Sequence, residues 1–217
     1  MRSRTKHRIL RLRYAAGAAG ILLAVWLAAS WLAVLRPARQ YGVTGTGDGY
    51  ELREYGELTA AQVRVTGSYP DALGHAVVLL DDYLDGENLK QPVEITTIRG
   101  RTTEASERVR GYGPVMWEEA DGTTVVSVIL PGRFTPDTAP RPKSPWVRIV
   151  SLPGRTVAAA SFRGPVSTAR VAEVAGELQR LLEDDKQLIL SQFRVAGYAP
   201  PWVFPPLRRT EIHVTVR

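Results

Sequence analysis

Two stretches, YELREYGELTAAQVRVTG at Tyr50–Gly67 and VRIVSLPGRTVAAASFRG at Val147–Gly164, decide the fold of this 217-residue chain. Each has two segments with the alternation of apolar and polar residues that is typical of β-strands. Each ends in a glycine, and the pattern of an amphipathic helix follows that glycine. The two glycines are 97 residues apart. A period of this length indicates a doubled unit and not a solenoid, whose repeats are shorter.

The helix patterns complete the doubled unit. One helix is expected between about 68 and 84, and the other between about 166 and 182, each with an apolar stripe on one side. Two such units can pair their strands around one core, with a helix packed on each half. We therefore predict an α+β domain at 50–217, in which pseudo-repeats at about 50–130 and 147–217 form a distorted β-barrel flanked by two helices.

An apolar segment precedes the domain. Tyr14–Leu35 contains no charged residue, and as a helix it would extend about 33 Å, enough for a hydrocarbon core of about 30 Å. We expect a basic cytoplasmic tail at 1–13, a transmembrane anchor at 14–35 and a flexible glycine-containing linker at 36–49. Six Lys or Arg residues precede the segment and two follow it closely, which predicts a single-pass protein of the cell membrane with its domain on the extracytoplasmic side. A cleaved signal peptide is the alternative.

Composition excludes several kinds of chemistry. The chain has no cysteine, which excludes disulfides, thiolate metal sites, a cysteine nucleophile and covalent c-type heme attachment. Eight of the 28 basic residues precede position 40, leaving 20 basic against 22 acidic residues, so the net charge of +6 gives no indication of nucleic-acid binding. The sequence contains neither a G-x-S-x-G nor an H-E-x-x-H motif and no cluster with metal-ligand spacing. We expect a domain that is not an enzyme.

The C-terminal region carries a recognisable set of motifs. Tyr198–Trp202 is an aromatic and proline-rich stretch, and Arg208–Ile212 follows it as Arg-Arg-Thr-Glu-Ile. Together they resemble the C-terminal signature of the SOUL heme-binding family. Tyr50–Tyr55 resembles the opening strand of that family, Tyr83–Asn88 its first helix end, and Phe162–Gly164 the strand end before its second helix. The family fold is a duplicated α+β barrel, in agreement with the repeat.

The resemblance implies a non-catalytic module that binds heme or a related tetrapyrrole, and the apolar segment 14–35 adds the membrane anchor. If heme binds in an apolar groove, we expect His75 of the first helix as the axial ligand, with Met116 as the alternative. Because His75 points away from the apolar stripe of its helix, the heme would lie on the outer face of that helix. The other residues expected at the heme are Val78, Arg99, Arg101 and Tyr112. A generic small-molecule sensor or carrier, like the related effector-binding domains, is the second hypothesis. Strand alternation places His213 on a polar face or at a sheet edge.

Overall fold

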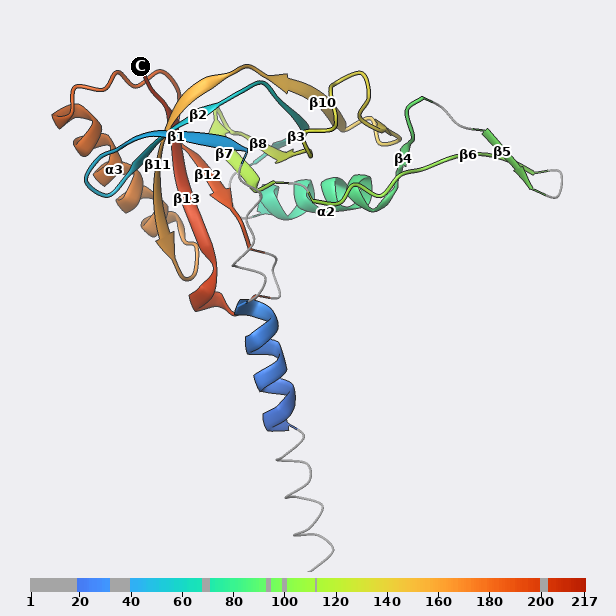
Figure 1. Cartoon of the computed structure of the whole chain (residues 1–217), viewed down its shortest axis with the longest axis horizontal. Coiled ribbons are helices and arrows are strands. Elements are labelled where there is room, and N and C mark those ends of the chain that lie inside the picture. The colour runs from blue at the N-terminus through green and yellow to red at the C-terminus, as the bar shows by residue number, and fades with distance from the viewer. Residues whose placement is uncertain are drawn as a thin grey trace, which may run out of the picture.

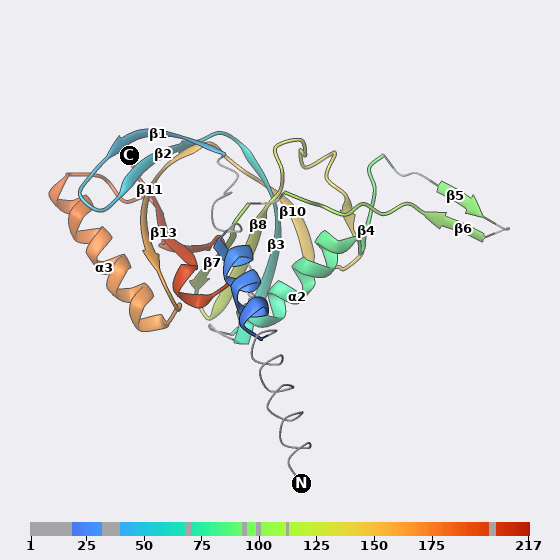
Figure 2. The same cartoon turned by 60° about the horizontal axis from the view of Figure 1, so that its bottom comes forward.

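The computed structural model describes residues 19–31, 40–67, 71–92, 95–98, 101–111, 113–199 and 203–217. Nine antiparallel strands form one curled sheet in the order β1-β2-β11-β13-β12-β7-β8-β3-β10, and two long helices pack against one side of it (Figures 1 and 2). The strands of this sheet are β1 (Tyr41–Thr46), β2 (Glu51–Tyr55), β3 (Leu58–Thr66), β7 (Val115–Ala120), β8 (Thr123–Ile129), β10 (Val147–Leu152), β11 (Arg155–Arg163), β12 (Arg194–Gly197) and β13 (Arg209–Thr215). The remaining elements are α2 (Asp71–Asp85), α3 (Thr168–Asp184), η1 (Pro205–Leu207), β4 (Asn88–Leu89) paired with β9 (Arg141–Pro142), and β5 (Ile95–Ile98) paired with β6 (Arg101–Glu104).

The predicted duplication is confirmed by the element boundaries. β3 and β11 are both nine residues long, and their first residues, Leu58 and Arg155, are 97 positions apart. The helices α2 and α3 begin at Asp71 and Thr168, with the same offset. The sheet order is symmetric about the contact between β12 and β7, because β2-β11-β13-β12 on one side mirrors β10-β3-β8-β7 on the other. The two halves are therefore related by a pseudo-two-fold axis at the β7–β12 contact.

The predicted distorted barrel is an open half-barrel, with β1 and β10 at the edges of its sheet. The pairing of the strands was not predicted. The two strands that precede each long helix pair with strands of the other repeat: β2 pairs with β11, and β10 pairs with β3. Each half therefore receives one strand from its counterpart, and each of the two core clusters under the helices includes residues of both repeats.

The helix-covered face holds most of the apolar core. Buried Ala76, Leu80 and Tyr83 of α2 pack against residues of β3 and β8, and buried Leu178 and Leu182 of α3 pack against residues of β11 and β13. Because successive side chains on a strand point to opposite faces, the residues between these core positions form the other face of the sheet. We call that helix-free side the inner face.

The side chain of Tyr50 fixes the end of α3. Its hydroxyl donates a hydrogen bond to the Oδ2 atom of Asp185, the residue that follows the helix. Burial, together with this bond, raises the pKa of Tyr50 to about 12. At the other end of α3, the Oγ atom of Ser167 accepts a 3.2 Å hydrogen bond from the backbone N–H of Arg170, which is the usual N-cap arrangement.

The structure changes the picture of the segment before Tyr50. Residues 41–46, expected within a flexible linker, form β1, which pairs with β2. The turn between them contains Gly49, whose φ of 79° lies in the left-handed region that suits glycine. Gly49 lies in the hairpin turn, and Gly45 lies at the irregularity in the pairing of β1 with β2. These glycines belong to a β-hairpin, so the linker prediction is wrong for residues 41–46.

The described N-terminal helix covers 19–31. Within the described residues, no helix has both the length and the apolar character needed to cross a membrane. The helix contacts the domain just ahead of β13: the ring of Trp26 lies edge-on to Phe204 with centroids 5.4 Å apart. The buried Ser30 accepts a 3.2 Å hydrogen bond at Oγ from the backbone N–H of Phe204.

Candidate ligand-binding site

A pocket opens on the inner face and spans both halves of the sheet. The space between its walls is about 570 Å³ when the solvent at its mouth is included, and the cavity itself has a volume of about 30 Å³. Its lining combines aromatic, aliphatic and charged side chains: Gln40, Tyr41, Tyr55, Leu58, Gly113, Pro114, Met116, Ile129, Arg155, Val157, Ser191, Arg194, Tyr198, His213, Val214 and Thr215.

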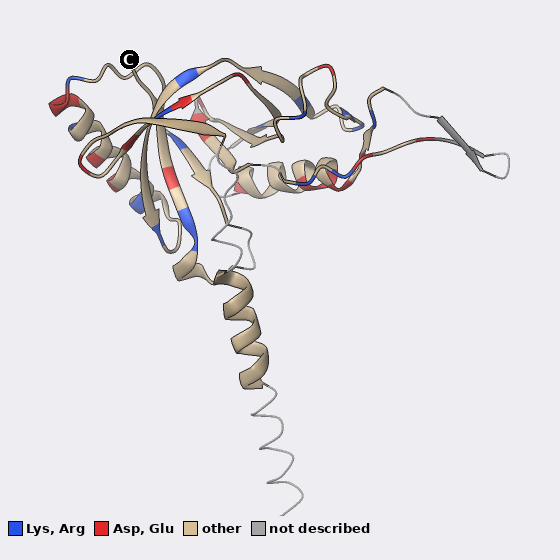
Figure 3. Cartoon of the chain, in the orientation of Figure 1, with Lys and Arg blue, Asp and Glu red and all other residues tan. Residues whose placement is uncertain are grey.

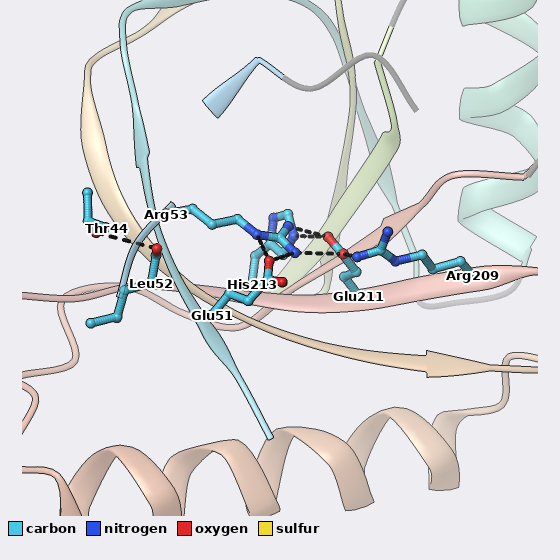
Figure 4. Close-up of polar contacts among 7 residues, drawn as sticks. All are labelled: Thr44, Glu51, Leu52, Arg53, Arg209, Glu211 and His213. Atoms are coloured by element: carbon cyan, nitrogen blue, oxygen red, sulfur yellow. Dashed lines mark hydrogen bonds and ion pairs between the residues drawn. The ribbon is translucent and has the colours of Figure 1, made fainter. Parts of the chain in front are cut away.

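A buried ionic cluster lies on the inner face of the sheet, and one of its members, His213, also lines the pocket. Arg53 of β2 is 1% exposed and donates to both carboxylate oxygens of Glu211 on β13, at 2.7 and 3.0 Å, as Figure 4 shows. Its Nε and Nη2 atoms also donate to Glu51, at 2.9 and 2.7 Å. Arg209 and His213 complete the coordination of Glu211. In Figure 3, opposite charges accordingly lie close together along β13.

The cluster keeps its charges although it is buried. Burial alone would raise the pKa of Glu211, but hydrogen bonds from His213 and Arg53 outweigh it and hold that pKa far below its usual range. Burial would lower the pKa of Arg53, and the two glutamates more than compensate. Burial lowers the pKa of His213 despite its bond to Glu211. The imidazole is therefore neutral, its Nε2–H donates to Glu211 over 2.8 Å, and its Nδ1 is an acceptor.

Tyrosine rings cover this polar side. The guanidinium of Arg53 lies 4.3 Å from the ring centroid of Tyr41, which in turn lies 5.2 Å from that of Tyr55. Arg209 lies 5.7 Å from the ring of Tyr198. Burial, with the charge of Glu211, raises the pKa of Tyr198 well above its ordinary value, so its phenol stays protonated. The rings of Tyr41 and Tyr55, which are tilted by 48° to each other, form an aromatic wall of the pocket.

The opposite side of the pocket is apolar, because the positions that are equivalent to the polar ones in the other repeat carry different residues. At the same offset of 97, Val150 corresponds to Arg53, and Leu58 corresponds to Arg155. Ser127 takes the place of His213, since each pairs with an equivalent residue, Gln62 or Ala159. By the same register, Val125 takes the place of Glu211. The apolar cluster on this side consists of Ala60, Met116, Ile129 and Ala196, flanked by Leu58, Val150 and Leu152.

Two polar groups in the pocket are poorly satisfied. The Oε1 atom of Gln40 is buried and has no hydrogen-bond partner among the described residues. Arg155, which is partly buried, makes one side-chain hydrogen bond in the described part of the chain, from Nη1 to the carbonyl oxygen of Pro153 at 3.3 Å. A buried acceptor without a donor costs about 1–3 kcal/mol. A bound ligand could satisfy both groups.

The residues predicted at the heme are distributed over different parts of the molecule. His75 and Val78 are exposed on α2, as expected for its outer face, and α2 covers the side of the sheet opposite to the inner face. Met116 is buried on the inner face and lines the pocket. The structure therefore does not bring His75 and Met116 together. Arg101 lies in β6, where its side chain is outside the description, and Arg99 and Tyr112 lie outside the described residues.

His213 is only partly where it was expected. It lies on a polar face, but β13 is a central strand between β11 and β12, so the sheet-edge alternative is wrong. The side chain is 6% exposed, with the ring of Tyr55 centred 6.4 Å from the imidazole. Arg53 and Arg155 were not among the predicted site residues. The available signal was the alternation of charged with apolar residues along 51–55 and 209–213.

The curled sheet, its duplicated halves and the inner-face pocket define a duplicated α+β binding domain. The family model described as SOUL heme-binding protein matches residues 36–215. The chain therefore belongs to the SOUL family, a family of binding proteins.

Solved structures agree on the fold. The C-terminal domain of EcmrR has a TM-score of 0.55 at 13% identity, and the match covers 82% of this chain and 99% of that one. A hydrolase from Listeria innocua has a TM-score of 0.50 at 15% identity, covering 80% and 94%. An uncharacterized conserved protein from Listeria innocua has a TM-score of 0.51 at 14% identity, covering 77% and 92%. No curated protein sequence matches the chain.

Proposed function

We propose that this protein binds heme or a related tetrapyrrole in the inner-face pocket, without catalysing a reaction. The observation that carries the proposal is the combination of an apolar side, with Leu58, Met116 and Ile129, and an aromatic wall of Tyr41 and Tyr55 in one pocket. Flat apolar ligands are favoured by such walls, because both of their faces can be removed from water. The family assignment supports the same class of ligand.

The residues in the pocket suit a heme. The thioether of Met116 and the neutral imidazole of His213 are side chains of the types that bind heme iron. A bound heme would supply an iron centre for axial ligands. Met116 would contact it from the apolar side, and the tyrosine rings would exclude water from its edge.

Heme titration of the full chain, followed by absorbance near the Soret band, tests the proposal. Leu58→Trp adds bulk to a pocket wall, and we expect it to weaken heme binding at least tenfold. The matched control is Val78→Trp on the exposed outer face of α2, where the side chain is 60% exposed. It should bind like the wild type, and so should His75→Ala. If Val78→Trp and His75→Ala lose binding while Leu58→Trp retains it, heme binds on α2 and the pocket assignment is wrong.

A second candidate is a carrier or sensor of another small amphipathic molecule. The unpartnered Oε1 atom of Gln40 favours it, because a ligand that carries a hydrogen-bond donor would satisfy this oxygen and a heme would not. Mass spectrometry of small molecules that co-purify with the protein would distinguish the candidates. A co-purifying tetrapyrrole supports heme binding. A different amphipathic compound that added heme does not displace supports the carrier or sensor.

We also propose that the protein is anchored in the cell membrane by residues 14–35, with its domain on the extracytoplasmic side. The support is the uncharged segment itself, with six basic residues before it and two closely after it.

A further inference from the structure

Two arginines line the inner-face pocket, Arg155 and Arg194, and they differ in their ion pairs. Arg194 pairs with Glu118. Nearby on the inner face, Arg53 pairs with Glu211 and Glu51, and Arg209 also pairs with Glu211. Arg155 has no carboxylate partner among the described residues, and it donates to the Pro153 carbonyl at 3.3 Å.

The surroundings of Arg155 make an anion favourable there. Burial and the positive charge of Arg194 lower the pKa of Arg155 by more than Tyr55 and the charge of Glu118 raise it. The positive charge of this partly buried arginine is therefore only partly compensated. The Tyr55 ring, with its centroid 6.0 Å from the guanidinium, covers one of its sides. An arginine fork is the side chain best suited to a carboxylate, since it can donate two parallel hydrogen bonds.

The pseudo-two-fold axis shows that the opposite end of the pocket is different. The residue equivalent to Arg155 is Leu58, and the residue equivalent to Tyr55 is Leu152, by the offset of 97. Both belong to the apolar group around Met116 and Ile129. A ligand that spans the pocket therefore meets aliphatic side chains at one end and a guanidinium at the other.

We infer that Arg155 binds an anionic group of the ligand and is the specificity-determining residue of the pocket, which selects amphipathic ligands with carboxylates at one edge. This inference rests on the proposed function and names the ligand class more closely. Arg155 orients the ligand, so that its apolar edge lies against Leu58 and Ile129 and its carboxylate edge faces Tyr55. Arg53 does not compete for this role, because its donors are already directed at Glu51 and Glu211.

The test compares protoporphyrin IX with its dimethyl ester, which has the same ring and no free carboxylate. Binding of each to the full chain is followed by porphyrin fluorescence. We expect the wild type to bind the diacid at least tenfold more tightly than the ester. Arg155→Gln should lower the affinity for the diacid to that for the ester and leave the ester unchanged. Arg155→Lys should recover part of the preference, because it restores the charge without the fork.

The matched control is Arg148→Gln, which removes an exposed arginine from β10 on the same inner face. It should keep the preference for the diacid. If the wild type binds both porphyrins equally, or if Arg155→Gln weakens the ester as much as the diacid, the specificity role of Arg155 is wrong while the pocket proposal stands. If neither porphyrin binds the wild type, the proposed function fails, and this inference fails with it.

Discussion

The contribution of the Arg53–Glu211 pair can be measured by a double-mutant cycle. Glu211→Leu leaves Arg53, which is 1% exposed, with Glu51 as its remaining carboxylate, and the Glu51 side chain is 43% exposed. Arg53→Met leaves the fully buried Glu211 with Arg209 and His213. Removing one partner of a buried pair costs about 3–5 kcal/mol. Because each remaining charge keeps some compensation, we expect each single variant to lose about 3 kcal/mol of unfolding free energy.

The double variant removes both charges. Arg209 and Glu51 are partly exposed and can turn to water, so the main remaining cost is the N–H of His213 without its acceptor, about 1–3 kcal/mol. The cycle should therefore give a coupling of about 3–5 kcal/mol. Urea unfolding of the full chain, followed by tryptophan fluorescence and circular dichroism, measures all four free energies.

An exposed pair on α3 provides the control for this cycle. Arg170 and Glu173 are 2.7 Å apart, with side chains 45% and 63% exposed, and their coupling should stay below about 0.5 kcal/mol. If the Arg53 and Glu211 variants each cost less than about 1 kcal/mol, or if the double variant loses the sum of the two, the buried pair does not stabilise the fold as we argue.

Three further predictions concern pH, a helix end and topology. The pKa of His213 in the folded protein lies below its ordinary 6.5, so the unfolded chain binds more protons, and stability should be full above about pH 6.5 and fall as the pH decreases. In His213→Gln, the melting temperature should change less between pH 7 and pH 5 than it does in the wild type, and equal changes in the two proteins would contradict the reasoning. At lower pH both proteins should still lose stability, because the pKa of Glu211 in the folded protein is depressed. Tyr50→Phe removes the bond to Asp185 and should cost about 1 kcal/mol in urea unfolding, and the same variant in an Asp185→Asn background should cost clearly less. Protease added to intact spheroplasts should digest the domain if 14–35 anchors it as proposed, and full protection would reverse the orientation.

The repeat could be predicted from the sequence because its signals are local. The alternation in 58–66 and 155–163 and the helix stripes that follow are visible without tertiary information, and they led to the correct duplicated α+β fold. Strand pairing was not visible. β2 and β3 are adjacent in the chain, yet β2 pairs with β11 and β3 pairs with β10. That exchange is set by the curvature of the whole sheet and by contacts about 100 residues apart.

The site was harder to predict because its members are distant in the sequence. Arg53 and Glu211 are separated by 158 positions, and nothing local joins them. The position of His75, away from the apolar stripe of its helix, led to the outer face of α2, where His75 and Val78 are exposed. Among the predicted residues whose side chains the structure describes, Met116 is the one that lines the pocket. The charged alternation along β2 and β13 was the missed clue, since charged residues on strands that also carry core residues require partners.

The exchange of strands between halves has a consequence for how the chain can be divided. A cut in the loop between β9 and β10 yields two fragments, and each contains a helix and most of one half-sheet. In the first fragment, β3 loses its neighbour β10, and in the second, β11 loses β2. Each fragment alone therefore exposes the edge of a strand, β3 or β11, that pairs with a strand of the other fragment in the intact domain. We therefore expect the two fragments to fold only when they are combined, and the intact domain to unfold as one cooperative unit despite its internal duplication.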